Sequence, residues 1–522
     1  MSFSRSSGIL LHPTSLPGRF GVGDLGPEAY NFADFLAATG QSLWQVLPLG
    51  PTGYGDSPYA CFSAFAGNTL LISPEHLLDD GLLDHADLRS APDFKEEERV
   101  DFDRAHKFKA ELLTKAFAHF KSTTDTALRA AFLAFCQRYS SWLDDYALFR
   151  ALKDTHGGVA WNEWEAPLVR RDAAALARAR ESLRDQTEAQ KFYQFLFFKQ
   201  WFALKDYCNK RGIHLIGDIP IFVAHDSSDV WTNPEQFKLD ASGKPLVVAG
   251  VPPDYFSATG QLWGNPLYNW ERMRADGFRW WIARVAATLQ TVDIVRIDHF
   301  RGFAACWEIP GGDKTAERGR WVEAPGRELF TAIRQALGVL PIIAEDLGVI
   351  TPDVEALRDD FGFPGMRILQ FAFSSDTTNH DLPHNYHSNV VVYTGTHDND
   401  TTVGWFKSEA GAGSTRDAAQ VEREREFCLK YLHTDGAEIH WDFIRTVLAS
   451  VANTAVVPLQ DLLGLGTTAR MNLPNSTSGN WAWRYRTGAL TSETGKRLKD
   501  LTDLYGRRTS DKKKVETIQT AH

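Results

Sequence analysis

Eight short apolar runs, rich in β-branched residues and bounded by turn residues, restrict the fold of this sequence more than any other feature. They are Ile9–Leu11, Leu43–Leu47, Ile213–Gly217, Val292–Ile297, Pro341–Ala344, Arg367–Phe371, Val390–Tyr393 and Ala455–Leu459. Amphipathic helical patterns separate most of these runs, at Ala29–Ala38, Trp280–Leu289, Gly326–Ala336 and Pro352–Phe361. Strands that alternate with helices form right-handed βαβ units and a parallel sheet. Eight such units predict an α/β fold, a closed (β/α)8 TIM barrel, in preference to an open doubly wound sheet.

The runs are unevenly spaced, which predicts two insertions into the barrel. Residues 68–212 have helical patterns throughout, at Phe108–Phe120, Ala127–Cys136, Ser141–Leu152, Asp172–Arg184 and Ala189–Asn209. This stretch is too long for one loop, so we expect a large, mainly helical insertion beside the barrel. Residues 223–277 are rich in Pro, Gly and aromatic residues. Because loops that follow barrel strands lie on the catalytic face, we expect this loop-rich insertion to wall the active site.

The remaining segments complete the expected domain organisation. Residues 1–67 supply the first two barrel strands and active-site loops, and residues 213–504 supply the other six strands. No strand-rich segment follows Trp483, so we expect no C-terminal β-domain. Residues 505–522 form a polar tail that we expect to fray.

Charge and composition exclude several classes of protein. The 66 acidic and 56 basic residues give a net charge of −10, so no basic excess is present to neutralise nucleic-acid phosphates or an acidic membrane. No apolar run approaches the ~20 residues that span a bilayer, and the polar residues 1–8 do not begin a signal peptide. The five cysteines lack metal or redox spacing, which is typical of free thiols in a reducing compartment. We therefore expect a cytoplasmic protein with no nucleic-acid or membrane partner. We also expect a monomer.

Acidic residues end or closely follow four of the runs, at Asp218, Asp298, Glu345 and Asp398. In a barrel of this kind the chemistry lies at the carboxyl ends of the strands. A strand-end carboxylate can instead cap the next helix, and that explanation is adequate for any one of the four. It is much less adequate for all four together, so the set predicts an active site.

Two of these carboxyls have different expected roles. Arg296 and Asp298 are two apart on a strand and point to the same face, where the guanidinium keeps the carboxylate ionised, as a glycosidic nucleophile requires. Glu345 is the natural proton donor, because glutamate starts ~0.4 pKa units above aspartate. Asp346 faces the other way and is expected to support the fold. A retaining glycosidase places its two carboxyls ~5–5.5 Å apart, a separation that adjacent parallel strands ~4.8 Å apart can deliver.

A third carboxylate, Asp398, could hold sugar hydroxyls and favour the charged transition state. Spacing alone does not separate it from Asp400, because both would share a strand face. Aromatic residues make up 12% of the chain, and flat aromatic faces suit the C–H face of a sugar. Burial in the core of a large protein is the alternative explanation for these residues.

Four segments resemble the four ordered motifs of the α-amylase clan: Asp218–Ala224, Arg296–Gly302, Glu345–Gly348 and Thr396–Asp400. More narrowly, the chain resembles amylomaltases, the 4-α-glucanotransferases or disproportionating enzymes of glycoside hydrolase family 77. This narrower likeness is carried by Gly8–Pro17, Gly53–Tyr59, Gly250–Pro266, Arg470–Pro474 and Gly479–Trp483, and it covers nearly all of the chain.

The resemblance implies Asp298 as nucleophile, Glu345 as acid/base and Asp398 as transition-state stabiliser. It implies sugar contacts from Ser57, Tyr59, Asp218, Tyr255, Gln261, Trp263, Arg296, His299, His397 and Asn472. It implies no metal and no other cofactor, and maltooligosaccharides or other α-1,4-glucans as the partners. The implied reaction transfers a glucan segment to the 4-hydroxyl of an acceptor through a covalent glycosyl-aspartate.

Two other functions remain open at this stage. The same carboxylates could serve an α-1,4-glucan hydrolase with water as the acceptor, although the aromatic, proline-stiffened loop 250–266 favours transfer because it can position a sugar and exclude water. A non-catalytic glucan-binding protein is disfavoured because all three carboxylates are present. The histidines His380, His384 and His387 imitate metal spacing, but Pro383 interrupts any helix that would align them.

Overall fold

The barrel strands of the computed structural model form one eight-stranded parallel sheet. The structure describes residues 3–94, 96–253, 259–374, 376–409, 417–474, 476 and 478–508. The strands are β1 (Ser6–Leu10), β2 (Leu43–Gln45), β3 (His214–Pro220), β6 (Ile294–Asp298), β9 (Ile342–Ala344), β10 (Gly365–Ile368), β11 (Val390–Tyr393) and β12 (Thr454–Pro458). Each of the eight predicted runs overlaps one of them.

The sheet closes into a barrel. The strand order is β10-β11-β12-β1-β2-β3-β6-β9, and the main-chain nitrogen of Ala344 at the end of β9 donates to the carbonyl oxygen of Pro364 just before β10, at 2.9 Å. Strands such as β1, β11 and β12 are buried along their whole length, as expected for a parallel sheet covered on the outside by helices and filled inside by side chains. The prediction of a (β/α)8 barrel is confirmed.

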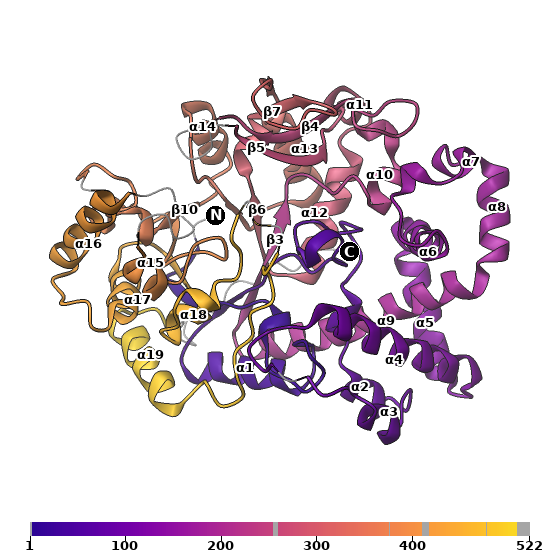
Figure 1. The fold of residues 1–522 in the computed structure, drawn as a ribbon, viewed down its shortest axis with the longest axis horizontal. Coiled ribbons are helices and arrows are strands. Elements are labelled where there is room, and N and C mark those ends of the chain that lie inside the picture. Colours follow the sequence, from indigo (N-terminus) through magenta and orange to yellow (C-terminus); the bar gives the residue numbers. More distant parts are fainter. Residues whose placement is uncertain are drawn as a thin grey trace.

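Helices of the barrel units cover the outside of the sheet (Figure 1). They are α1 (Pro27–Ala38), α12 (Arg279–Thr291), α13 (Gly326–Leu337), α14 (Pro352–Asp360), α15 (Thr402–Lys407), α16 (Ala418–Leu432), α17 (Ile439–Ala449), α18 (Leu459–Leu462) and α19 (Ser492–Leu504). In the described part of the segment between β10 and β11 the connection has only the 3-10 turns η7 (Leu369–Phe371) and η8 (Pro383–Asn385). That connection therefore departs from the regular strand–helix alternation.

A group of helices stands beside the barrel, on the side opposite to α15–α19 (Figure 1). It consists of α2 (Pro74–Asp79), α3 (His85–Arg89), α4 (Phe102–Ser122), α5 (Thr126–Arg138), α6 (Ser140–Thr155), α7 (Ala166–Val169), α8 (Ala173–Ser182) and α9 (Arg184–Lys210). Its helices pack through aromatic rings, for example Phe120 against Phe192 with ring centroids 4.3 Å apart. The longest helix, α9, leads directly into β3, so this group is built on the loop between β2 and β3.

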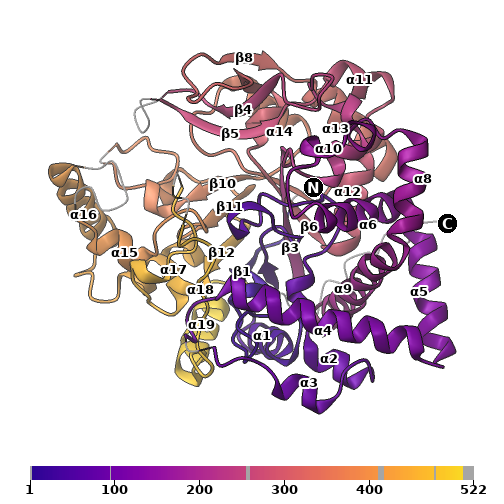
Figure 2. The same cartoon turned by 45° about the vertical axis from the view of Figure 1, so that its right-hand side comes forward.

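A four-stranded antiparallel sheet, which the sequence did not predict, lies beside the barrel. Its strands are β4 (Val247–Val251), β5 (Gln261–Pro266), β7 (Ala305–Pro310) and β8 (Arg320–Glu323), in the order β5-β4-β7-β8. Figure 2 shows it above the barrel strands. The insertion at residues 223–277, which also carries α10 (Ser228–Thr232) and α11 (Trp270–Ala275), is therefore more ordered than the loop-rich segment we expected. β4 is itself a short apolar run, but its pairing with β7, a strand of a different barrel loop, is not a local property of either segment.

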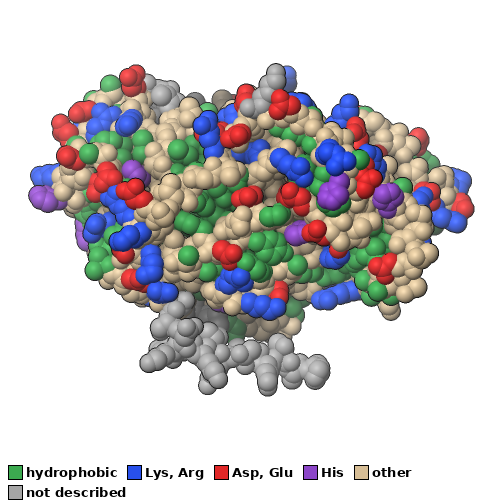
Figure 3. Space-filling view, turned by 90° about the horizontal axis from the view of Figure 1, so that it is seen from below, with side chains coloured by type: hydrophobic (Ala, Val, Ile, Leu, Met, Phe, Trp, Pro, Cys, Tyr) green, Lys and Arg blue, Asp and Glu red, His purple; other side chains and the backbone are tan. Residues whose placement is uncertain are grey.

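Two surface properties bear on possible partners. No helix in the described residues is both long and apolar enough to cross a membrane. Acidic and basic side chains are interspersed over the face of the molecule seen in Figure 3, so that face presents a mixed rather than a strongly basic surface.

Candidate functional site

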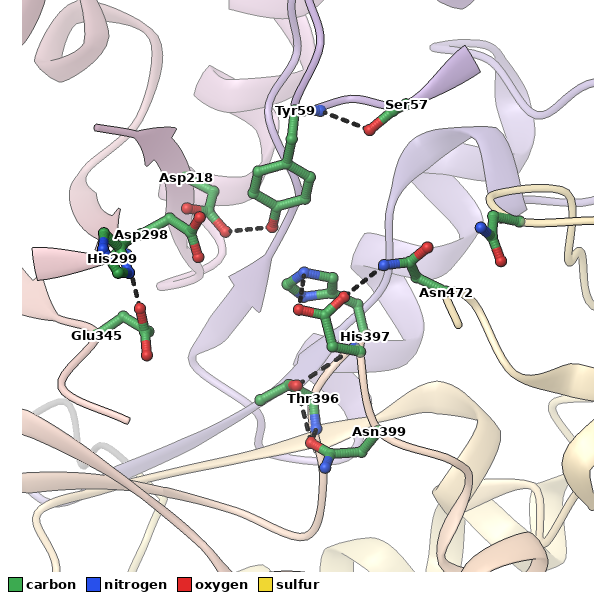
Figure 4. Close-up of polar contacts among 12 residues, drawn as sticks. Ser57, Tyr59, Asp218, Asp298, His299, Glu345, Thr396, His397, Asn399 and Asn472 are labelled. Atoms are coloured by element: carbon green, nitrogen blue, oxygen red, sulfur yellow. Dashed lines mark hydrogen bonds and ion pairs between the residues drawn. The ribbon is translucent and has the colours of Figure 1, made fainter. Parts of the chain in front are cut away.

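The candidate site lies at the carboxyl ends of three neighbouring strands, β3, β6 and β9, and in the loop after β11. Asp218 in β3 is in register with Arg296 in β6, and Ile297 in β6 is in register with Ala344 in β9. Asp298 and Glu345, one residue further on, therefore end adjacent strands. Figure 4 shows their side chains on one side of the site and those of His397 and Asn472 on the other.

Arg296 joins two carboxylates on the barrel floor. Its Nη1 lies 2.5 Å from Oδ2 of Asp218, and its Nη2 lies 2.9 Å from Oδ1 of Asp298. The hydroxyl of Tyr59 donates to the same Oδ2 of Asp218, at 2.8 Å. Burial raises the pKa of Asp218 to about 6, although Arg296 acts in the opposite direction. Burial acts to lower the pKa of Arg296, but the two carboxylates hold it well above its ordinary value, so the guanidinium stays charged.

Glu345 has the environment of a proton donor. Its Oε2 accepts a hydrogen bond from the main-chain nitrogen of His299 at 2.6 Å, and its Oε1 accepts one from that of Leu347 at 2.9 Å. Burial and then the negative charge of Asp298 raise the pKa of Glu345 to about 8, against the opposing effects of Arg296 and the two N–H groups. Glu345 is therefore protonated at neutral pH. Neighbouring strands thus present an ion-paired carboxylate and a protonated carboxyl.

Asp398 lies across the site in the loop that follows β11. The side-chain amide of Asn472 donates to its Oδ1 at 2.6 Å, and Nε2 of His397 lies 3.4 Å from its Oδ2. The guanidinium of Arg470 donates to its carbonyl oxygen at 2.6 Å. These contacts hold the Asp398 carboxylate, which is about half exposed, with polar groups on two sides.

The structure separates Asp398 from Asp400, which spacing alone did not. Residues 396–399 form a loop rather than a strand, so the two side chains do not share a strand face. Oδ2 of Asp400 accepts from the Thr467 hydroxyl at 2.9 Å, and its Oδ1 accepts from the main-chain nitrogen of Thr401 at 2.8 Å. Asp400 is thus engaged in holding its own loop, whereas Asp398 contacts other predicted site residues.

Aromatic rings lie beside the carboxylates. Tyr59 stacks on His397 with ring centroids 5.1 Å apart and planes 16° from parallel, and Trp481 lies 5.8 Å and 6.0 Å from these two rings. On the other side, Trp263 meets His299 edge to face at 4.7 Å. The Trp263 side chain is 37% exposed, which leaves part of its apolar face available to a ligand.

The remaining predicted contacts are more peripheral. Oε1 of Gln261 accepts a hydrogen bond from the indole nitrogen of Trp263 at 3.1 Å. The hydroxyl of Ser57 accepts one from the main-chain nitrogen of Tyr59 at 3.2 Å. Tyr255 is among residues 254–258, which lie outside the described part of the chain.

Three residues in or behind the site were not among the predicted site residues, and each had a signal in the sequence. Trp481 and Arg470 lie in segments that carried the family resemblance, but only Asn472 was selected from them. Asp461 follows the last barrel strand, which ends at Pro458. The rule that found the other strand-end acids would have found Asp461 as well.

Metal binding has no structural support in the described residues. They contain no group of three or more His, Cys, Asp or Glu side chains that could hold a metal ion. The ring nitrogens of His384 contact the Tyr431 hydroxyl at 2.9 Å and the carbonyl oxygen of Thr377 at 3.2 Å. The prediction that Asp346 supports the fold matches its contacts, because it accepts from the main-chain nitrogen of Met366 and pairs with Arg358.

A (β/α)8 barrel whose strand ends carry an ion-paired and a protonated carboxyl, with exposed aromatic rings beside them, has the design of enzymes that act on glycosidic bonds. The 4-alpha-glucanotransferase family profile matches residues 11–491. The chain is 53% identical to a 4-alpha-glucanotransferase of Synechocystis sp., over 97% of this chain and 98% of that one, and 51% identical to one of Thermus thermophilus, over 96% and 99%. An amylomaltase of Streptococcus agalactiae, solved in complex with acarbose, superposes with a TM-score of 0.92 at 43% identity, over 97% of this chain and all of that one.

The chain therefore belongs to the 4-alpha-glucanotransferase family, as the sequence motifs indicated. Membership confirms the prediction of a glucan-transferring enzyme and does not favour the hydrolase alternative.

Proposed function

We propose that this protein transfers α-1,4-glucan segments between maltooligosaccharides with retention of configuration, and that Asp298, Glu345 and Asp398 carry the chemistry. The observation that carries the proposal is the contrast between neighbouring strand ends: Asp298 is ion-paired with Arg296, whereas burial keeps Glu345 protonated. A retaining mechanism needs one carboxylate nucleophile and one carboxyl proton donor close together.

In the first half-reaction the Asp298 carboxylate attacks the anomeric carbon of the donor. The bond from that carbon to the 4-oxygen of the leaving sugar breaks, and Glu345 gives its proton to this oxygen. The leaving segment departs with a new 4-hydroxyl, and the rest of the donor stays attached to Asp298 as an ester. Asp398 interacts with hydroxyls of the distorted sugar as positive charge develops at the anomeric carbon.

In the second half-reaction the 4-hydroxyl of another glucan attacks the same carbon. The Glu345 carboxylate takes the proton of this hydroxyl, the ester bond breaks, and Asp298 is free again. Two inversions at the anomeric carbon give net retention. The polar side chains around the carboxylates, such as His397 and Asn472, are placed to contact sugar hydroxyls, and the exposed ring of Trp263 is placed to pack on a sugar face.

Incubation of the purified protein with maltotriose alone, without added cofactor, tests the proposal directly. Glucose together with a ladder of longer maltooligosaccharides is the expected result, because an acceptor sugar outcompetes water for the glycosyl-enzyme. A mixture of only glucose and maltose, with reducing ends that increase in time, would show that the carboxylates serve hydrolysis instead.

A further inference from the structure

A buried carboxylate lies behind the loop that carries Asp398. Asp461, in α18 directly after β12, is 1% exposed. It accepts hydrogen bonds from the Thr394 hydroxyl at 2.5 Å, from the main-chain nitrogen of Thr402 at 2.6 Å and from the Thr402 hydroxyl at 2.8 Å. These three donors compensate the burial of the carboxylate.

The donors of Asp461 stand at the two ends of one loop. Thr394 directly follows β11, and Thr402 is the first residue of α15. The loop between them, residues 395–401, contains His397 and Asp398 and has no strand or helix of its own. One buried side chain therefore holds both ends of the segment that presents Asp398 to the site.

Other contacts act on residues 396–401, between the two threonines that donate to Asp461. Inside the loop, the side-chain oxygen of Asn399 accepts from the main-chain nitrogen and the hydroxyl of Thr396, at 2.8 Å and 2.9 Å. From outside, Arg470 donates to the carbonyl oxygen of Asp398 and Gln370 donates to that of Asp400. Near the α15 end, the Thr467 hydroxyl donates to Asp400, and the Thr401 hydroxyl accepts from the main-chain nitrogen of Gly404. Each of these bonds acts at one place, whereas Asp461 bonds to residues on both sides of the loop.

We propose that Asp461 is a positioning residue for Asp398: by holding Thr394 and Thr402 together it places the Asp398 carboxylate against Asn472 and the reacting sugar. The inference rests on the proposed role of Asp398. Asp461 is too deeply buried to touch a glucan, so its effect on catalysis runs entirely through the loop. A group that stabilises a transition state must be held closely, and a shift of about 1 Å can reduce turnover about 10²-fold.

The test is a double-mutant cycle between Asp461 and Asp398, read by kcat and KM for maltotriose disproportionation. Asp461→Ala should lower kcat about 10- to 100-fold and change KM by less than about threefold. In the Asp398→Asn background the same Asp461→Ala change should lower kcat less than about twofold, because the group that Asp461 positions is already disabled.

Two further variants grade the effect. Asp461→Asn should lose less kcat than Asp461→Ala, because the amide oxygen can still accept from the main-chain nitrogen of Thr402, and the threonine hydroxyls can turn to accept from the amide nitrogen. Thr394→Val removes a single hydrogen bond to Asp461 and should fall between wild type and Asp461→Ala. If Asp461→Ala does not fold, Thr394→Val and Asp461→Asn take its place in the cycle.

Asp293→Ala is the matched control for general loss of stability. The Asp293 carboxylate also ties two elements together, since it accepts from the main-chain nitrogen of Leu215 and the side-chain amide of Asn209, both at 2.8 Å. It lies at the amino end of β6, away from the catalytic end of the barrel. This variant should lower Tm, as Asp461→Ala does, but leave kcat unchanged.

The outcomes separate this inference from the proposed function. If Asp461→Ala keeps the wild-type kcat, or if its loss persists undiminished in the Asp398→Asn background, Asp461 does not act through Asp398 and the inference is wrong. If Asp398→Asn itself keeps the wild-type kcat, the proposed role of Asp398 fails instead.

Discussion

The Oε2 atom of Glu345 accepts a 2.6 Å hydrogen bond from the main-chain nitrogen of His299, the residue that directly follows Asp298. His299 has a left-handed backbone conformation, with φ 54° and ψ 51°. This conformation is strained for a residue with a side chain. It turns the chain at the end of β6 so that this N–H faces the carboxyl of the neighbouring strand. The peptide group between Asp298 and His299 therefore connects the two residues: it follows the proposed nucleophile in the chain, and its N–H bonds to the proposed acid.

Replacement of either member of this pair should abolish most turnover while glucan binding remains. Glu345→Gln removes the proton donor and should lower kcat about 10²- to 10⁴-fold. Asp298→Asn removes the nucleophile and should cost at least as much, because the covalent route is lost. Product analysis on maltotriose measures turnover, and isothermal titration with acarbose measures binding. Wild-type rates in both variants would refute the assigned roles.

The pH dependence of activity should have an alkaline limb set by Glu345. Burial and the charge of Asp298 raise its pKa to about 8, so the acid is protonated at neutral pH and loses its proton as the pH rises through that value. The kcat/KM for maltotriose should therefore fall above about pH 8. The limb should be absent in Glu345→Gln, and also in the wild type with an aryl maltooligoside whose leaving group needs no proton. An alkaline limb that persists in Glu345→Gln would assign it to another group.

The sequence supported the prediction of the barrel and its carboxylates because both signals are local. Each barrel strand is a short apolar run, and Asp218, Asp298 and Glu345 stand at the ends of such runs. The contacts that complete the site are not local. Tyr59 donates to a carboxylate 159 residues away, and Thr394 donates to Asp461, 67 residues away.

The elements that escaped prediction share this non-local origin. Strands β4 and β7 pair although they belong to different barrel loops, so the pattern of either segment alone does not predict the small sheet. The distinction between Asp398 and Asp400 depends on the conformation of a loop whose residues bond to Asp461 and Thr467, both of which follow β12. Sequence spacing could propose both residues but contained no information with which to choose between them.

Replacement of Trp263 should increase hydrolysis relative to transfer. The Trp263 ring lies beside the carboxylates, where it meets the His299 ring edge to face, and it is 37% exposed. A ring in this place can hold an acceptor sugar against the intermediate and exclude water. In Trp263→Ala the ratio of newly formed reducing ends to longer oligosaccharides should rise several-fold. Trp321→Ala is the matched control, because Trp321 is also exposed but lies in β8, at the opposite edge of the same sheet. An equal ratio in both variants and the wild type would contradict the role of Trp263.

Removal of Arg296 should destabilise the fold through the carboxylates that it leaves behind. Arg296→Leu leaves Asp218 and Asp298 close together without their shared cation, and breaking a buried pair of this kind costs about 3–5 kcal/mol. The double variant Arg296→Leu/Asp218→Leu should recover part of this loss, because the more deeply buried charge is gone. Arg274→Leu, which breaks an exposed pair with Glu328, should cost less than about 1 kcal/mol.

The loss in Arg296→Leu should also depend on pH in a definite direction. Burial already raises the pKa of Asp218 to about 6 in the presence of Arg296, and without the guanidinium the ionised form is less favourable still. A carboxyl whose folded pKa is raised binds its proton more tightly in the folded state, so its ionisation removes stability as the pH rises. The free energy of unfolding of Arg296→Leu, measured by urea denaturation, should therefore approach that of wild type as the pH falls toward 5. A deficit that stays constant between about pH 5 and pH 8 would show that lost packing, rather than unpaired charge, destabilises the variant.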